Sequence, residues 1–234
     1  MVIGVAGKYC AGKSTVTDIL AGDGYRVIDV DRLGHEALAR RVDDVRHTFG
    51  DEYIGADGAV DRTRLGSLVF RDREAMRRLE GIVHPEMVEM VRERLAAGTR
   101  GAAEGTQGAA GNHGPASASQ GAAGGTQGGA GGTQGGAGDH APRGTVVNAA
   151  LLFPMGLDAL CDMVLWVEAP LALRLKRARE RDGLSVQEIL RRFWAQRELE
   201  PQPSSSDVDI HSVENRGGLD LLRAQLAELS LLEE

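Results

Sequence analysis

The chain has 234 residues, of which 42% are hydrophobic and 26% charged, and its formal net charge is −7. This composition predicts a globular chain with a normal core, and the acidic balance excludes a general affinity for nucleic acids. No apolar run approaches the length of a membrane span, the N-terminus lacks a basic leader, and the two cysteines, Cys10 and Cys161, lie far apart. We therefore expect a cytoplasmic protein with reduced thiols that has neither nucleic acid nor a membrane as its partner.

Short apolar runs alternate with longer amphipathic ones along the chain, which is typical of βαβ units and a parallel sheet. Strands are predicted at residues 2–6, 26–30, 145–149, 163–168 and 209–213. The expected fold class is therefore α/β.

The first predicted strand leads into Gly-Lys-Tyr-Cys-Ala-Gly-Lys-Ser at residues 7–14, here called the phosphate loop, and a helical stretch follows it. This segment satisfies the pattern G-x-x-x-x-G-K-[ST], and the preceding strand and following helix disfavour a chance glycine-rich turn. In such a loop, backbone N–H groups surround the phosphates of a nucleoside triphosphate, the lysine reaches the terminal phosphates, and the serine hydroxyl ligates magnesium. The expected nucleotide contacts are Gly7, Lys8, Tyr9, Cys10, Ala11, Gly12, Lys13, Ser14 and Thr15.

Two aspartates, Asp29 and Asp31, end the second predicted strand, and the alternation of a strand would place both on one face. Parallel α/β sheets bind ligands at this edge. One interpretation is a polar turn in which Asp31 caps the next helix. Beside the phosphate loop, the other interpretation is favoured, in which a carboxylate is ready to orient a hydroxyl nucleophile.

Residues 61–97 keep a helical spacing of apolar side chains, which predicts a helical subdomain between the second and third strands. We expect Pro85 to break this stretch, because proline lacks a backbone donor and restricts the residue before it. His84 would then either begin a helix or contact a substrate.

Residues 98–144 contain 17 of the 32 glycines and no Val, Leu, Ile, Met, Phe, Tyr or Trp, and the unit Gly-Gly-Thr-Gln-Gly-Gly-Ala occurs twice. A segment of this composition cannot bury a core, and it lacks the apolar heptads of a coiled coil and the triplets of collagen. We expect a disordered insertion in one domain.

After the fourth strand, residues 171–197 are predicted to form two helices that meet near residues 182–185, with Ser185 and Glu188 as a capping box. Arg174, Arg177 and Arg181 would share one helix face. This face is either solvated or part of a lid whose arginines meet a phosphoryl group. A final helix is predicted at 219–231, and Trp166 and Trp194 are expected in the core.

In combination, these features resemble the dephospho-CoA kinase family over nearly all of the chain outside the insertion. No later motif is specific alone, but their order separates this family from adenylate, shikimate and gluconate kinases. The motifs are the phosphate loop, Val-Ile-Asp-Val-Asp-Arg at 27–32, Phe-Gly at 49–50, Ala-Asp-Gly at 56–58, Val-His-Pro at 83–85, Leu-Leu-Phe at 151–153, Lys-Arg at 176–177 with Arg-Asp at 181–182, and Glu-Asn-Arg-Gly at 214–217.

The resemblance implies a three-layer phosphate-loop kinase fold with a parallel five-stranded sheet, formed by residues 1–97 and 145–234. Residues 60–97 would bind CoA, and residues 171–197 would contain the lid. The implied reaction is ATP-dependent phosphorylation of the ribose 3′-hydroxyl of dephospho-CoA with Mg²⁺. The site residues expected from the motifs and the resemblance together are Asp31, Lys13, Arg177 and Arg181 for catalysis, Asn215 near the adenine, Asp29, Asp31 and His84 for substrate, and Ser14 and Asp29 for metal.

The chain departs from the family pattern in three places. Lys8 replaces a second glycine in the loop, Ala-Leu-Leu-Phe-Pro at 150–154 replaces Pro-Leu-Leu-Phe-Glu, and a Ser/Pro-rich run at 201–206 replaces Arg-x-x-Ala-Asp. Two alternatives therefore stay open: a kinase for another small hydroxyl or nucleotide substrate, and a nucleotide-binding interaction module that has lost catalysis. A monomer is expected, with weak self-association left open.

Overall fold

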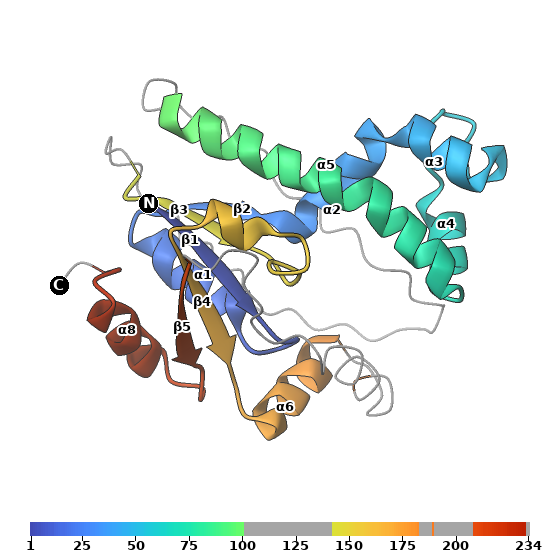
Figure 1. Ribbon diagram of the computed structural model, residues 1–234. Helices are drawn as coiled ribbons and strands as arrows, with labels where there is room; N and C mark the ends of the chain where they lie inside the picture. The colour runs from blue at the N-terminus through green and yellow to red at the C-terminus, as the bar shows by residue number, and fades with distance from the viewer. Residues whose placement is uncertain (101–141, 183–188, 190–207, 233–234) are drawn as a thin grey trace, which may run out of the picture.

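The computed structural model describes residues 1–100, 142–182, 189 and 208–232. In these ranges, five strands form one parallel sheet in the order β2-β3-β1-β4-β5 (Figure 1). The strands are β1 (Val2–Gly7), β2 (Arg26–Asp29), β3 (Thr145–Asn148), β4 (Met163–Glu168) and β5 (Asp209–Glu214). The five strands and the parallel α/β class predicted from the sequence are confirmed.

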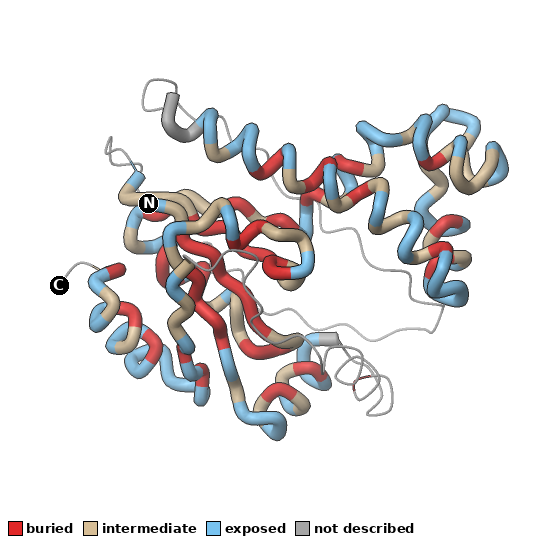
Figure 2. The backbone as a smooth tube through the Cα atoms, viewed as in Figure 1, coloured by how far each residue is buried: buried red, intermediate tan, exposed pale blue. Residues whose placement is uncertain are grey.

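Helices cover both faces of the sheet, which gives the expected three layers (Figure 1). Helices α1 (Lys13–Gly22) and α8 (Leu219–Glu228) supply Leu20 and Leu226 to the core on one face. Helices α2 (Val30–Arg40) and α5 (Arg73–Arg100) supply Leu33 and Met90 to the core on the other face. Because helices cover both faces, the inner strands β1, β3 and β4 are largely buried, whereas the edge strands β2 and β5 are partly exposed (Figure 2).

The second strand ends one residue earlier than predicted, and this corrects the argument for the two aspartates. β2 stops at Asp29, and α2 begins at Val30, so Asp31 lies in the first turn of a helix. Val30, Leu33 and Ala37 are buried at helical spacing, and their packing on the sheet draws the chain into a helix directly after Asp29. The alternation of a strand therefore does not relate Asp29 to Asp31.

A helical extension projects from one end of the sheet between α2 and β3 (Figure 1). It contains α3 (Val42–Phe49), a 3₁₀ turn (Asp51–Tyr53), α4 (Arg62–Val69) and the first part of α5. Its small core is formed by Val45, Leu65, Val69 and Ala75. The helical character predicted for residues 61–97 is thus confirmed by α4 and α5.

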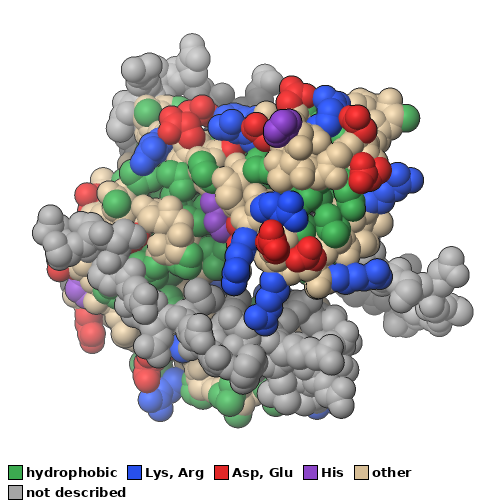
Figure 3. Space-filling view, turned by 45° about the vertical axis from the view of Figure 1, so that its right-hand side comes forward, with side chains coloured by type: hydrophobic (Ala, Val, Ile, Leu, Met, Phe, Trp, Pro, Cys, Tyr) green, Lys and Arg blue, Asp and Glu red, His purple; other side chains and the backbone are tan. Residues whose placement is uncertain are grey.

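Ion pairs join α2 to α5 next to this extension. Glu86 of α5 pairs with Arg41 at 2.7 Å and with Arg40 at 3.3 Å, and Arg94 pairs with Glu36 at 2.7 Å. Acidic and basic side chains are interspersed over the face shown in Figure 3. Helix α2, with Asp31 in its first turn, is therefore held to α5 by both apolar and charged contacts.

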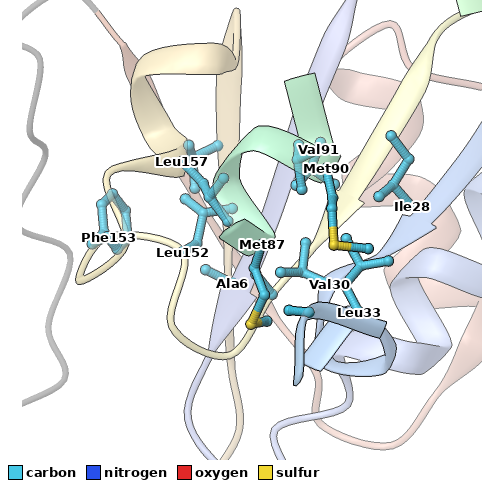
Figure 4. Packing of buried hydrophobic residues seen from close by; sticks show 14 of the residues in the cluster. Ala6, Ile28, Val30, Leu33, Met87, Met90, Val91, Leu152, Phe153 and Leu157 are labelled. Carbon is cyan, nitrogen blue, oxygen red and sulfur yellow. The ribbon is translucent and has the colours of Figure 1, made fainter. Parts of the chain in front are cut away.

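The predicted helix break at Pro85 is wrong, because α5 continues through this proline. The break lies instead between α4 and α5, where the carboxylate of Asp72 accepts hydrogen bonds from the N–H groups of Glu74 and Ala75. Met87, Met90 and Val91 pack against Val30 and Leu33 of α2 and against the sheet (Figure 4). This packing offsets the backbone hydrogen bond that proline cannot donate. His84 consequently lies inside a helix and does not begin one.

Helix α6 (Leu171–Asp182) follows β4. The predicted capping box at Ser185 and Glu188, the second helix of the 171–197 region, Trp194 and the run at 201–206 lie outside the described residues. At the Gly-rich insertion, α5 extends to Arg100, beyond the expected boundary, and the N–H of Arg26 donates to the carbonyl of Gly144 at 3.0 Å.

Both cysteines are free thiols, as expected. Burial raises the pKa of Cys161 to about 12, so this thiol is inert at neutral pH. Trp166 is only 4% exposed and lies 6.0 Å from the ring of Phe153, which confirms its place in the core. No helix in the described ranges has the length and apolar character required to cross a bilayer.

Candidate active site

The phosphate loop connects the central strand β1 to the N-terminus of α1 and needs glycine at both ends. Gly7 and Gly12 have φ of 153° and 100°. A Cβ atom at Gly7 would collide with the carbonyl oxygen of Val167, and one at Gly12 would collide with the side-chain amide of Asn215. The loop therefore lies tightly against β4 and the turn after β5, with the positive end of the α1 dipole beside it.

Lys13 and Asp31 form the electrostatic centre of this site. The ammonium of Lys13 donates to the carbonyl of Gly7 at 3.3 Å. Burial lowers the pKa of Lys13, and the charge of Asp31 opposes this shift. Asp31 remains solvent-accessible, but the surrounding protein partly desolvates its carboxylate and raises its pKa, against the opposing charge of Lys13. The two residues predicted to act on the phosphoryl donor and the acceptor are thus brought together.

The departure at residue 150 supplies Asp31 with a hydrogen bond. The N–H of Ala150 donates to the Asp31 carboxylate at 3.5 Å. Proline, which the family pattern has at this position, has no N–H to donate. Ala150 thus helps to hold Asp31 at the carboxyl edge of the sheet.

Asp29 and Asn148 bring two unsatisfied oxygens to this edge. They are register partners on β2 and β3, and Oδ1 of each is buried without a hydrogen-bond partner among the described residues. The second carboxylate oxygen of Asp29 pairs with Arg32 at 3.2 Å. The sequence analysis missed Asn148, although a polar residue that ends the apolar run Val146-Val147 was the available signal. Two unpaired oxygens suit a cation or a hydroxyl donor.

Ser14 and Asp29 fit the magnesium role that the sequence assigns to them. Magnesium is usually bound through one or two carboxylates together with substrate phosphates and water, so a dedicated cage is unnecessary. Within the described ranges, no group of three or more His, Cys, Asp or Glu residues could hold a metal. The unpaired Oδ1 of Asp29 and the exposed hydroxyl of Ser14 at the start of α1 meet the smaller requirement.

One face of α6 lies on the phosphate loop. Arg174 donates to the carbonyl of Tyr9 at 2.8 Å, Arg177 donates to the carbonyl of Ala11 at 3.1 Å, and the guanidinium of Arg181 lies 5.2 Å from the centre of the Tyr9 ring. The three- and four-residue spacing of these arginines therefore correctly predicted that they share one helix face, and this face contacts the phosphate loop. The alternative of a solvated face is wrong for Arg174, which is 9% exposed, and for Arg177.

The structure places Asn215 against the phosphate loop and His84 within α5. The side chain of Asn215 is 2% exposed and is hydrogen-bonded to Ala11 and Arg177. His84 is half-buried in α5, and no described contact joins it to the loop.

A pocket of about 290 Å³ lies beside the loop at the carboxyl ends of β4 and β5. Its volume is close to the lower bound of small-molecule sites, about 300 Å³. Its lining includes Lys8, Ala11, Trp166, Glu168, Arg174 and Glu214. The loop lysine that departs from the family pattern thus faces a ligand-sized space.

Comparisons with known proteins agree with this geometry. A family model described as dephospho-CoA kinase matches residues 1–103 and 138–219. The chain is 29% identical to the dephospho-CoA kinase of Carboxydothermus hydrogenoformans, over all of this chain and 93% of the relative. It is 31% identical to that of Anaeromyxobacter dehalogenans, over 97% of this chain and 90% of the relative.

Solved structures show the same fold. A crystal structure of a Thermus thermophilus protein matches with a TM-score of 0.64 at 27% identity, covering 100% of this chain and 98% of that one. The dephospho-CoA kinase of Campylobacter jejuni shares the fold, with a TM-score of 0.57 at 20% identity over 98% of this chain and 95% of that one. The phosphate loop and the position of Asp31 beside Lys13 agree with the match along the chain, and this protein belongs to the dephospho-CoA kinase family.

Proposed function

We propose that this protein transfers the γ-phosphoryl group of ATP to the ribose 3′-hydroxyl of dephospho-CoA and so makes coenzyme A. The observation that carries the proposal is Asp31 beside Lys13 at a phosphate loop, in a chain that matches the family over most of its length. A loop alone would support nucleotide binding; a carboxylate next to its lysine adds a group that can act on the acceptor.

In the proposed reaction, Lys13 and the loop N–H groups hold the triphosphate, and Asp31 accepts the proton of the 3′-hydroxyl. The ribose oxygen then bonds to the γ-phosphorus while the bond to the leaving ADP breaks. A raised pKa makes Asp31 a better proton acceptor than an ordinary aspartate. Ser14 and Asp29 would hold Mg²⁺, whose charge, when it is bound, offsets that of the phosphates.

The remaining roles are assigned by position. Arg177 and Arg181 lie on the α6 face at the loop and would offset charge as the phosphoryl group moves. The helical segment at 60–97 would bind the CoA portion, with His84 as a substrate contact, and 171–197 would act as the lid. Asn215, by resemblance to the family, would lie near the adenine. We further propose a cytoplasmic monomer, which fits the two free thiols.

Acceptor identity is tested by a panel assay. The purified protein is given Mg-ATP with dephospho-CoA, adenosine monophosphate, shikimate or gluconate, and ADP release is measured. We expect selective turnover of dephospho-CoA. Equal or faster turnover of another acceptor would favour a different kinase specificity, and ATP binding without turnover of any acceptor would favour the interaction module.

A further inference from the structure

Three consecutive carbonyl groups of the phosphate loop accept hydrogen bonds from side chains outside it. The Tyr9 carbonyl accepts from Nε of Arg174 at 2.8 Å. The Cys10 carbonyl accepts from Arg177 at 3.5 Å, and the Ala11 carbonyl accepts from Arg177 at 3.1 Å and from Nδ2 of Asn215 at 3.0 Å. These donors come from α6 and from the turn that follows β5. They fix the direction of the loop carbonyls, and so of the peptide N–H groups between them.

The composition of the loop explains why it needs this support. Residues 8–11 are Lys, Tyr, Cys and Ala, and Cys10 has a φ of 58°, in the left-handed region that favours glycine. A non-glycine residue keeps such a conformation only where its surroundings hold it there. The hydrogen bonds to the carbonyls on both sides of Cys10 and to its own carbonyl provide that restraint.

The side chain of Asn215 is hydrogen-bonded by the protein at both its oxygen and its nitrogen. Its Oδ1 accepts from Arg177 at 2.7 Å and from the N–H of Gly217 at 3.3 Å, while its Nδ2 donates to Ala11. Its own N–H donates to the carbonyl of Glu168 at 2.7 Å, which anchors it to the end of β4. The side-chain bonds use both acceptor positions of Oδ1 and one of the two N–H groups of Nδ2, so the buried amide has little capacity left to recognise a base.

We propose that Arg174, Arg177 and Asn215 form a carbonyl clamp that holds the phosphate loop in its phosphate-binding shape before the nucleotide arrives. Asn215 is then a positioning residue that acts through Arg177 and the loop, and it does not read the adenine. The inference rests on the proposed function only in taking the loop as the triphosphate site.

A ligand without a base separates the two roles of Asn215. We would measure the Kd of tripolyphosphate with magnesium, and kcat/KM for ATP and for GTP, in the wild type, Asn215→Leu, Arg177→Met and the double variant. Lys176→Ala is the control, because Lys176 is exposed on the same helix and its one ion pair among the described residues is with Glu180 at 3.9 Å.

The clamp predicts that Asn215→Leu weakens tripolyphosphate binding about tenfold, the usual effect of losing a hydrogen bond to a charged group. It also predicts that kcat/KM falls by a similar factor for ATP and GTP, so their ratio is unchanged. The double variant should lose less than the product of the single losses, because Asn215 acts through Arg177. Lys176→Ala should match the wild type.

Two outcomes would overturn the clamp in distinguishable ways. If tripolyphosphate binding is unchanged in both single variants and the ratio of kcat/KM for ATP to that for GTP falls strongly in Asn215→Leu, Asn215 contacts the base. Failure of the wild type to bind tripolyphosphate would instead contradict the proposed function, because the loop would not be a phosphate site. If Asn215→Leu does not fold, Arg177→Met carries the test, since it keeps the apolar stem of the arginine.

Discussion

At the residue scale, Asp31 and Lys13 show how opposing effects set the chemistry of the site. Desolvation favours the neutral form of each side chain, so it raises the pKa of Asp31 and lowers the pKa of Lys13, and the attraction between the two charges opposes both shifts. Desolvation is the larger effect for both groups. The site therefore contains an unusually basic carboxylate next to a lysine that gives up its proton more readily than usual.

Replacing Asp31 with asparagine should leave the shape of the site intact while removing its proton acceptor. We expect turnover of dephospho-CoA to fall about 10²- to 10⁴-fold, the usual contribution of a general base, while ATP still binds. Steady-state kinetics and ATP titration check this result. Asp29→Asn is the matched control: if it proves the more damaging substitution, the roles of the two aspartates are exchanged.

The pH profile should report the same carboxylate. Asp31 must be ionised to accept a proton, so activity rises as the pH rises through its pKa, and desolvation places that pKa above the usual aspartate range. The measurement is kcat/KM for dephospho-CoA against pH at saturating Mg-ATP. The Asp31→Asn variant is the control, because it keeps any fall of kcat/KM at low pH that comes from protonation of ATP itself. If kcat/KM falls in the same way at low pH in the wild type and in Asp31→Asn, Asp31 does not accept the proton.

At the element scale, α5 joins the helical extension to the sheet across Pro85. The helix packs on α2 through Met87 and Met90 and pairs with Arg40 of α2 through Glu86, so the position of α2, which carries Asp31, depends on α5. Local rules predicted a break at Pro85 because they consider only the backbone. The burial of the residues after the proline outweighs that local cost.

Replacing Pro85 with alanine should stabilise the protein. The exposed proline lowers the free energy of unfolding by up to about 3 kcal/mol because it lies in a helix interior. Its rigidity reduces the entropy of the unfolded chain, which offsets about 1 kcal/mol of this loss. We therefore expect a net gain of about 1–2 kcal/mol in the free energy of unfolding. Urea denaturation measures this gain. A loss of stability would indicate that the proline conformation itself is required at this turn of α5.

At the whole-molecule scale, the Gly-rich insertion joins α5 to β3 between well-fixed ends. Arg143 pairs with Asp23 and lies 5.5 Å from the centre of the Tyr25 ring, and its N–H donates to the carbonyl of Gly24. These contacts belong to the folded domain, although composition assigned Arg143 to the insertion. The segment that can be removed is therefore residues 101–141.

Replacing residues 101–141 with about 10 Gly and Ser residues should be nearly silent, because loop-closure entropy changes by only about 1 kcal/mol. The segment contains no large apolar side chain, so no core contact is expected to be lost. Melting temperature and dephospho-CoA turnover of the full-length and shortened proteins check this. A drop of several degrees or a tenfold loss of rate would show that the segment contributes to the domain.

The sequence predicted the sheet, the phosphate loop and the arginine face of α6 because each depends on local spacing. It predicted Asp31 correctly beside the loop but by an incorrect argument, since helix packing, which spans distant residues, ends β2 early. Asn148 and the surroundings of Asn215 depend on strand register and on contacts across the chain. Local patterns do not contain this information.

The most direct test of the account is the structure of the reaction product. The protein is incubated with Mg-ATP and dephospho-CoA, and the product is analysed by mass spectrometry and ³¹P NMR. We predict a new phosphomonoester on the ribose 3′-oxygen, formed in equal amount with ADP. A phosphate on another oxygen, or ADP released without any phosphorylated acceptor, would contradict the proposed transfer.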